Sequence, residues 1–221
     1  MSLRLLIPCC LVLLLTGCQS DMRGALQTLQ TAALGAEQPS GARLDPRFAY
    51  LRVTMGKKIA FLALGYVEPD SRGPIEVWYS AEREVIRLQN GRLVGAAGTL
   101  TEWREVRMPD LPSWRELANR RSPYAWSRVR DVMPGYQYNI QDQLTVVPIA
   151  PLHNSRVVGI APESLTWFEE SLQSAPAHPA LNLPPARYAV AFSADAARVV
   201  YAEQCISIDI CLTWQRWVAG Q

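Results

Sequence analysis

Alternating apolar and polar positions run along most of the chain from Phe48 onward. Stretches such as FAYLRVTM (48–55) and EWREVRM (102–108) repeat with a period of two, which is typical of half-buried strands. Asn90-Gly91, placed between two apolar runs, predicts a tight β-hairpin. Further strand-like runs are predicted over residues 59–67, 75–81, 84–98, 130–151, 187–193, 198–207 and 210–218.

Two short segments have a helical pattern instead. Residues 112–121 begin with Pro112-Ser113, a common helix start, and residues 162–172 (PESLTWFEESL) again carry a proline in the first turn. Many short strands with few helices predict a mainly β fold over residues 47–221, either an antiparallel barrel-like domain or a sandwich, with short peripheral helices. The pattern does not distinguish the barrel from the sandwich.

The N-terminus has the pattern of a secretory signal. Arg4 precedes an apolar run from Leu5 to Leu15, about eleven residues, whereas a membrane-spanning helix needs about twenty. Small residues end the run directly before Cys18, and this Leu-Thr-Gly-Cys resembles the lipobox of bacterial lipoproteins. The resemblance implies cleavage after residue 17 and acylation of Cys18 with fatty acid such as palmitate. The alternative is an ordinary signal peptide with a chance cysteine.

Residues 18–46 are predicted to form the lipidated N-terminus and a tether. AEQPSGARLDP (36–46) is rich in Pro, Gly and small polar residues, as linkers are. In bacterial lipoproteins an Asp after the cysteine usually retains the protein at the inner membrane. Gln19 at this place therefore favours an outer-membrane anchor, with the domain facing the periplasm.

The net charge limits the partners that the protein can have, and its cysteines allow a disulfide. The net charge of +2 falls to +1 once Arg4 is removed, which argues against nucleic acid as a partner. In an exported protein, Cys205 and Cys211 are free to form a disulfide. On one straight strand they would lie about 20 Å apart, but a turn at 207–209 would bring them face to face. We predict this bridge; two free buried thiols are the alternative.

Motifs that carry enzyme chemistry are missing from the sequence. It contains no Gly-x-Ser-x-Gly elbow, HExxH, CxxC or phosphate-binding glycine loop. His153 and His178 lie in loop-like contexts, and Glu169-Glu170 would point apart on the expected helix, which makes them a poor acid–base pair. We therefore expect a protein that is not an enzyme, with no catalytic residue, metal or cofactor.

Aromatic residues offer a binding hypothesis. The chain has seven tryptophans, and residues 103–130 combine three of them with a tyrosine and seven arginines. Flat aromatic faces and guanidinium groups suit sugars and acidic polymers. Alternatively, the tryptophans fill the core and the arginines face solvent. The candidates for glycan or partner contact are Trp103, Trp114, Tyr124, Trp126, Arg120 and Arg121.

Three stretches resemble the YjbF/GfcB family, the group 4 capsule polysaccharide lipoproteins. They are FAYLRVTMGKKIAFLALGYVEP (48–69), IEVWYSAEREVIRLQNGRLVGAAG (75–98) and RVRDVMPGYQYN (128–139). The most telling parts are Trp78-Tyr79 ahead of the Asn90-Gly91 hairpin, and Pro134-Gly135-Tyr136. The family also begins with a lipobox, which Cys18 matches.

The resemblance implies a barrel-like β domain anchored in the outer membrane, and a role in making or exporting capsule or exopolysaccharide. It implies two partners, a periplasmic protein and an outer-membrane β-barrel protein, and it brings no catalytic residue. We expect a non-enzymatic lipoprotein that contacts these partners or the polymer. The alternatives are an enzyme acting on envelope glycans and a structural lipoprotein for envelope integrity.

Overall fold

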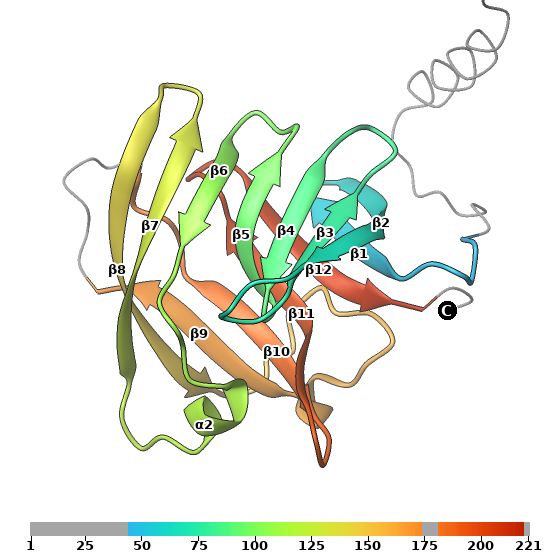
Figure 1. Cartoon of the computed structure of the whole chain (residues 1–221). Helices are drawn as coiled ribbons and strands as arrows, with labels where there is room; N and C mark the ends of the chain where they lie inside the picture. Colours follow the sequence, from blue (N-terminus) through green and yellow to red (C-terminus); the bar gives the residue numbers. More distant parts are fainter. Residues whose placement is uncertain (1–43, 174–180, 219–221) are drawn as a thin grey trace, which may run out of the picture. The chain divides into compact units, whose positions relative to one another are not determined.

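The strands close into an antiparallel barrel. The computed structural model describes residues 44–173 and 181–218, and twelve strands within them follow one another around the barrel in chain order. Strand β1 (Tyr50–Met55) pairs with β12 (Cys211–Trp217) and closes the ring (Figure 1). The mainly β prediction is confirmed, and the structure selects the barrel over the sandwich.

Apart from β1 and β12, neighbouring strands are consecutive in sequence, and short hairpin connections join most of them. The single α-helix and one 3₁₀ turn within the described residues lie between strands. The remaining elements are β2 (Lys58–Glu68), β3 (Ile75–Tyr79), β4 (Val85–Gln89), β5 (Arg92–Ala97), β6 (Glu102–Arg107), α2 (Trp114–Ala118), β7 (Tyr124–Met133), β8 (Gln137–Ile149), η1 (Pro162–Ser164), β9 (Thr166–Leu172), β10 (Ala186–Phe192) and β11 (Ala197–Cys205).

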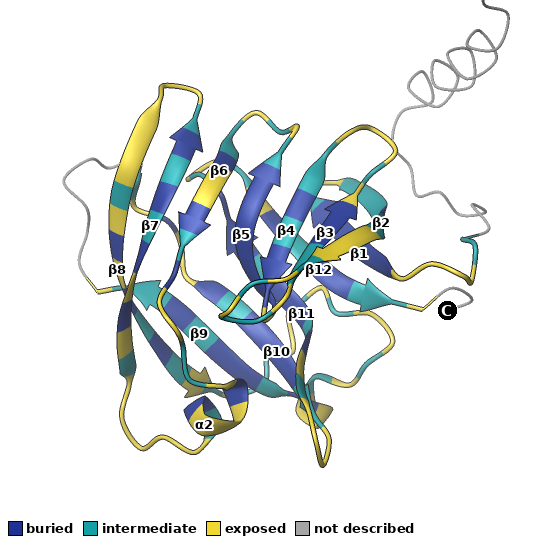
Figure 2. Cartoon of the chain, viewed as in Figure 1, coloured by how far each residue is buried: buried dark blue, intermediate teal, exposed yellow. Residues whose placement is uncertain are grey.

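Alternate side chains of the strands fill the barrel interior. Leu51 and Val53 of β1 belong to one large buried cluster with Trp78 of β3 and Trp214 of β12. Figure 2 shows the resulting bands of buried and exposed residues along the strands. Each large apolar side chain buried in this way contributes about 1.5–3 kcal/mol. The period-two pattern of the sequence therefore corresponds to inward and outward positions.

A second apolar cluster lies outside the barrel wall. Trp167 of β9 and Tyr201 of β11 are buried there beneath the connection between β8 and β9. The side-chain amide of Gln215 accepts from the backbone N–H of Val158 at 2.9 Å and donates to its carbonyl at 2.7 Å. This connection is thus fastened against β12, and β9 is buried on both faces.

The two helix predictions had different outcomes. Helix α2 lies within predicted residues 112–121, and Ser113 caps it: its hydroxyl accepts from the Glu116 N–H while the Glu116 carboxylate accepts from the Ser113 N–H. The helix predicted over 162–172 is wrong, because a 3₁₀ turn and strand β9 occupy this segment. Side chains on both faces of β9 are buried, so strict alternation is lost, and the apolar residues Leu165, Phe168 and Leu172 fall at the spacing of a helix.

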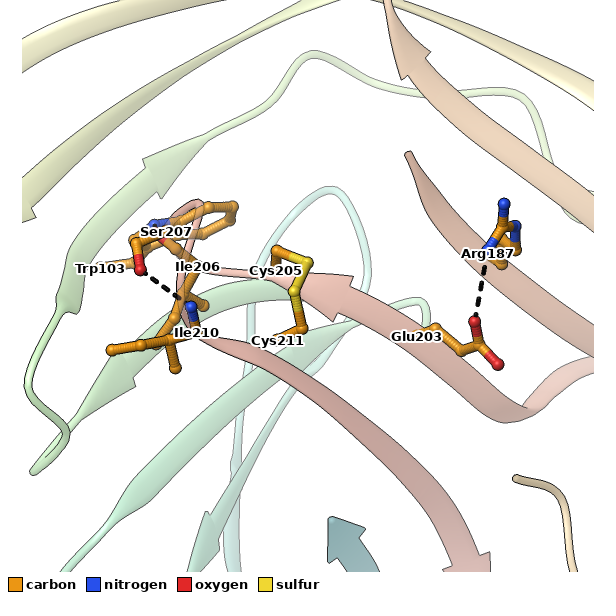
Figure 3. Close-up of a disulfide and its surroundings, with 8 residues drawn as sticks. All are labelled: Trp103, Arg187, Glu203, Cys205, Ile206, Ser207, Ile210 and Cys211. Atoms are coloured by element: carbon orange, nitrogen blue, oxygen red, sulfur yellow. Dashed lines mark hydrogen bonds and ion pairs between the residues drawn. A yellow bond between two sulfur atoms is a disulfide. The ribbon is translucent and has the colours of Figure 1, made fainter. Parts of the chain in front are cut away.

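Local turn predictions hold at both predicted hairpins. Asn90 and Gly91 have φ values of 51° and 79°, the left-handed geometry that a two-residue hairpin needs. Cys205 and Cys211 are a register pair of β11 and β12, and a disulfide joins them (Figure 3). Trp103 of β6 donates its indole N–H to the Ile206 carbonyl at 2.9 Å, so the hairpin beyond the disulfide is also held by the barrel.

Candidate functional site

A buried ion pair crosses the barrel interior near α2. Arg92 of β5 donates from Nε to Glu170 Oε2 of β9 at 3.1 Å, and their side chains are 4% and 1% exposed. The Tyr188 hydroxyl lies 3.4 Å from Glu170 Oε1 and 3.3 Å from Gln204 Oε1. Burial and the nearby Glu170 charge raise the pKa of Tyr188 far above its ordinary value. Tyr188 therefore stays protonated and serves as a hydrogen-bond donor.

A second buried cluster joins β7 to β8. Arg128 and Arg130 each donate from Nε to Asp142 Oδ2 at 2.7 Å, so two cations share one carboxylate. The ring of Trp103 lies 4.7 Å from the guanidinium carbon of Arg128 and 5.3 Å from that of Arg130. Its π face stabilises positive charge that Asp142 alone does not balance.

The three tryptophans predicted for glycan or partner contact lie in the barrel interior. Trp103, Trp114 and Trp126 are 1%, 4% and 6% exposed. The ring centroids of Trp114 and Trp126 lie 3.9 Å and 5.7 Å from the guanidinium carbon of Arg92. The interpretation that tryptophans fill the core thus describes their packing, and they form no common surface with the exposed arginines.

The other three candidates lie around the connection from α2 to β7. Tyr124 is half-buried, and the guanidinium carbon of Arg120 lies 5.0 Å from its ring centroid. Arg120 and Arg121 are both exposed. Contact of any of the six candidates with a glycan or a partner protein stays a prediction.

A pocket of about 390 Å³ opens at the end of the barrel where α2 begins. The segments around it are not neighbours in the barrel, because β1 and β2 separate β3 to β5 from β11 and β12. The pocket therefore bridges the barrel opening. Its lining residues are Pro74, Glu76, Asn90, Gly91, Arg92, Leu111, Pro112, Ser113, Trp114, Ala197, Arg198, Val199 and Arg216.

Close backbone approach shapes one wall of this pocket. A Cβ on Gly91 would lie 2.3 Å from the Val199 side chain, so only glycine lets the β4–β5 turn reach β11. The Trp114 indole N–H donates to the Asn90 carbonyl at 2.9 Å. The ring of Trp114 also packs against Phe168 and Tyr188, with centroids 5.0 and 5.1 Å away. The turn and the start of α2 are thus joined into one rigid wall.

The pocket lining is positively charged, with three arginines and one glutamate. Arg216 donates from Nη2 to both carboxylate oxygens of Glu76 at 2.8 Å, and from Nε to the Val199 carbonyl at 3.0 Å. Arg198 is exposed and makes no ion pair or hydrogen bond through its side chain with any described residue. Such a lining can hold an anionic group beside the apolar surface of Val199 and Pro112.

The described part of the chain offers few grouped side chains for acid–base or metal chemistry. No group of three or more His, Cys, Asp or Glu side chains gathers there in a way that could hold a metal ion. His153 Nδ1 lies 2.9 Å from Glu163 Oε1, on the surface. His178 lies outside the described residues.

The sequence interpretation missed the buried charges and the pocket. Arg128 and Arg130 share the strand face of Trp126 and Val132, and that spacing of two is the signal that could have placed them inside. Glu170 was assigned to a helix, which hid its inward position on β9. No local sequence pattern marks Arg198 or Arg216 as pocket residues, because the segments that line the pocket lie far apart in the sequence.

The predicted signal peptide (1–17), Cys18 and residues 18–43 of the predicted tether lie outside the described residues, and these assignments stay predictions. Along the described stretches, no helix combines the length and the apolar character needed to span a bilayer.

Comparison with known proteins identifies the family. Residues 36–178 match the family model described as group 4 capsule polysaccharide lipoprotein GfcB, YjbF. No curated protein matches the chain at a significant level. Among solved structures, the hypothetical lipoprotein YmcC from Escherichia coli K12 is similar, with a TM-score of 0.59 and 14% identity over 90% of this chain and 96% of that one. At such identity this likeness shows the fold alone. The family match spans more than half of the sequence, and the chain therefore belongs to the YjbF/GfcB family of capsule polysaccharide lipoproteins.

Proposed function

We propose that the protein is a non-enzymatic outer-membrane lipoprotein that faces the periplasm and assists capsule or exopolysaccharide production or export. It acts by contact with partner proteins, a periplasmic protein and an outer-membrane β-barrel protein, or with the polymer itself. Membership of the family over residues 36–178 is the observation that carries this proposal. Acylation of Cys18 would hold the domain at the membrane, since several acyl chains anchor a protein far better than one.

The environment of the interior carboxylates supports a role without catalysis. Glu170 is held by Arg92, and Asp142 by two arginines, so the lone pairs of both carboxylates are engaged inside the barrel. Glu76, at the pocket, is held by Arg216. A general acid or base must reach the substrate and exchange a proton with it. These carboxylates instead act as fixed counter-charges to arginines.

The hairpin between β7 and β8 supports a contact role. Tyr136 and Tyr138 are 71% and 58% exposed there, with ring centroids 6.5 Å apart. In Figure 1 this hairpin projects beyond the adjacent β5–β6 connection. Exposed aromatic faces on a projecting hairpin suit contact with a protein partner or a sugar ring.

The test is surface polysaccharide in a deletion strain. We expect less polymer on deletion, restoration by the wild-type protein, and no restoration by a soluble Cys18→Ala form exported with a cleavable signal. Replacement of both Tyr136 and Tyr138 with serine should reduce restoration without lowering the amount of protein. The matched control replaces Tyr66, which is also exposed, with serine.

Two outcomes would contradict the proposal. If deletion leaves surface polymer unchanged while the gene is expressed, the role in polysaccharide production fails. Detergent sensitivity without polymer loss would then favour a structural role in the envelope. If the purified protein releases reducing ends from a polysaccharide, the non-enzymatic part of the proposal fails.

A further inference from the structure

We infer that the pocket at the α2 end of the barrel binds a carboxylate-bearing sugar unit of an acidic polysaccharide. This inference rests on the proposed function and names the class of ligand for one site on the molecule. The acidic group is recognised by arginines of the lining, and the sugar ring lies against its apolar wall. The net positive charge of the lining, its unoccupied donors, and the size and mixed polar and apolar character of the cavity all favour such a ligand.

The charge of the lining is unbalanced toward positive. The lining holds three arginines, Arg92, Arg198 and Arg216, and one carboxylate, that of Glu76. Its net charge is therefore +2. Counting Glu170, which pairs with Arg92 from behind the lining, still leaves a net charge of +1. Clefts lined by one sign of charge concentrate ligands of the opposite sign. The ligand that this lining favours is an anion.

Donor groups for that anion are unoccupied. Arg92 uses Nε for Glu170, and its two Nη groups make no hydrogen bond with the described residues, although the side chain is only 4% exposed. Arg198, at the rim, likewise has no partner among them. The Nη groups of Arg92 are not among the buried polar atoms that lack a partner, so they remain accessible at the pocket and can donate to a ligand there. A carboxylate can accept two parallel hydrogen bonds from the N–H groups of one guanidinium.

Size and wall chemistry favour a sugar acid over a small inorganic anion. The volume of about 390 Å³ falls within the range of small-molecule sites, roughly 300–1,000 Å³. Leu111, Pro112, Val199 and Trp114 supply apolar surface. Pyranose rings have apolar faces that pack on such surfaces. A phosphate ion would leave most of this surface without contact.

The experiment measures binding by the full mature protein in detergent with isothermal titration calorimetry. The probes are galacturonate and glucuronate oligomers, glucose oligomers of the same length, and inorganic phosphate. We expect the acidic oligomers to bind and the glucose oligomers not to bind. The affinity should fall as salt is raised, because screening weakens an exposed charge contact.

A matched pair of variants places the binding at the pocket. Arg198→Gln should weaken binding of the acidic oligomers about fivefold, the loss of roughly one charge-assisted contact. Arg121→Gln is the control, since Arg121 is equally exposed but lies outside the lining. It should bind as the wild type does. Both positions are on the surface, so both variants should fold.

Several results would overturn the inference. These are equal binding of acidic and glucose oligomers, binding of neither, unchanged affinity in Arg198→Gln, or complete displacement of the oligomers by phosphate at equal concentration. The deletion strain separates this failure from failure of the proposed function. If Arg198→Gln restores surface polymer fully and no oligomer binds, the pocket inference fails and the proposed function stands. If deletion does not alter polymer, the proposed function fails whatever the pocket binds.

Discussion

The two ends of the barrel differ, because a hairpin covers one of them and an open pocket lies at the other. Strands β3, β5 and β11 begin at the pocket end, so the hairpins that follow β3 and β11 lie at the opposite end. There the Cys205–Cys211 disulfide and the Trp103 hydrogen bond hold the hairpin of residues 206–210 against the barrel. At the pocket end, α2 and the β4–β5 turn leave a charged cavity open.

The barrel interior also holds two buried charge clusters, Arg92 with Glu170 and Arg128 and Arg130 with Asp142, and their surroundings differ. Arg92 lines the pocket, so water or a ligand can reach the pair that it forms with Glu170. The side chains of Arg130 and Asp142 are each 1% exposed, and the ring of Trp103 packs beside the Arg130 guanidinium. Burial of a charged side chain costs free energy, and this cost is smaller where solvent still reaches the charged group. The cluster around Asp142 is therefore enclosed by the fold, whereas the cluster of Arg92 and Glu170 is open to the proposed ligand site.

The largest expected effect comes from the cluster that Asp142 forms with Arg128 and Arg130. Asp142→Asn should lower the free energy of unfolding by about 3–5 kcal/mol, because it leaves two buried arginines without their counter-charge. Urea unfolding at neutral pH measures it. Glu170→Gln is the matched variant in the other cluster, and its loss should be smaller by about 1 kcal/mol or more, since Arg92 reaches the pocket. Equal losses would contradict the distinction between the two clusters.

Removal of the disulfide should have the next largest effect. The double variant Cys205→Ser, Cys211→Ser should lose about 2 kcal/mol, because the bridge closes a short loop and short loops restrict the unfolded chain least. Thermal unfolding under non-reducing conditions measures the loss, and wild type with reductant should match the variant. Two free thiols in the natively exported protein, found by non-reducing mass analysis, would disprove the bridge.

The parts of the fold that the sequence predicted are those with local causes. The turn at Asn90-Gly91, the cap at Ser113 and the Cys205–Cys211 pairing each depend on a few adjacent residues. Closure of the barrel depends on β1 pairing with β12, at opposite ends of the described chain. No local pattern encodes that pairing, and the sequence therefore left barrel and sandwich open.

The candidate site was predicted less well, for a physical reason. Arginine is assigned to the surface unless its partner is known, and the partner of Arg92 lies on β9, four strands away around the ring. Of the six contact candidates, Trp114 reaches the pocket, where it forms part of the wall. Pocket residues such as Arg198 come from separate elements, so their meeting depends on the closed ring.

The helix cap at the pocket end should have a smaller effect than the disulfide. Ser113→Ala removes a side-chain acceptor from the first turn of α2 and should cost about 1 kcal/mol. Urea unfolding gives the value, and Ser122→Ala, in the exposed connection after α2, is the control. A cost no larger than that of the control would show that Trp114 and Leu117 alone hold the helix in place.

The smallest expected effect is a pH dependence at the end of the barrel that the hairpin covers. Burial raises the pKa of Glu84, but hydrogen bonds from Ser80 and Lys58 outweigh it and leave the pKa below the ordinary value of 4.5. Ionised Glu84 therefore adds stability above that value, and the contribution is lost as pH falls through the lowered pKa. Glu84→Gln should be less stable than wild type at pH 7 by under about 1 kcal/mol, as for partly exposed ion pairs. Urea unfolding at stepwise lower pH should show the difference shrink as pH falls below 4.5 and vanish once pH lies below the lowered pKa of Glu84; a constant difference would exclude Glu84 as its source.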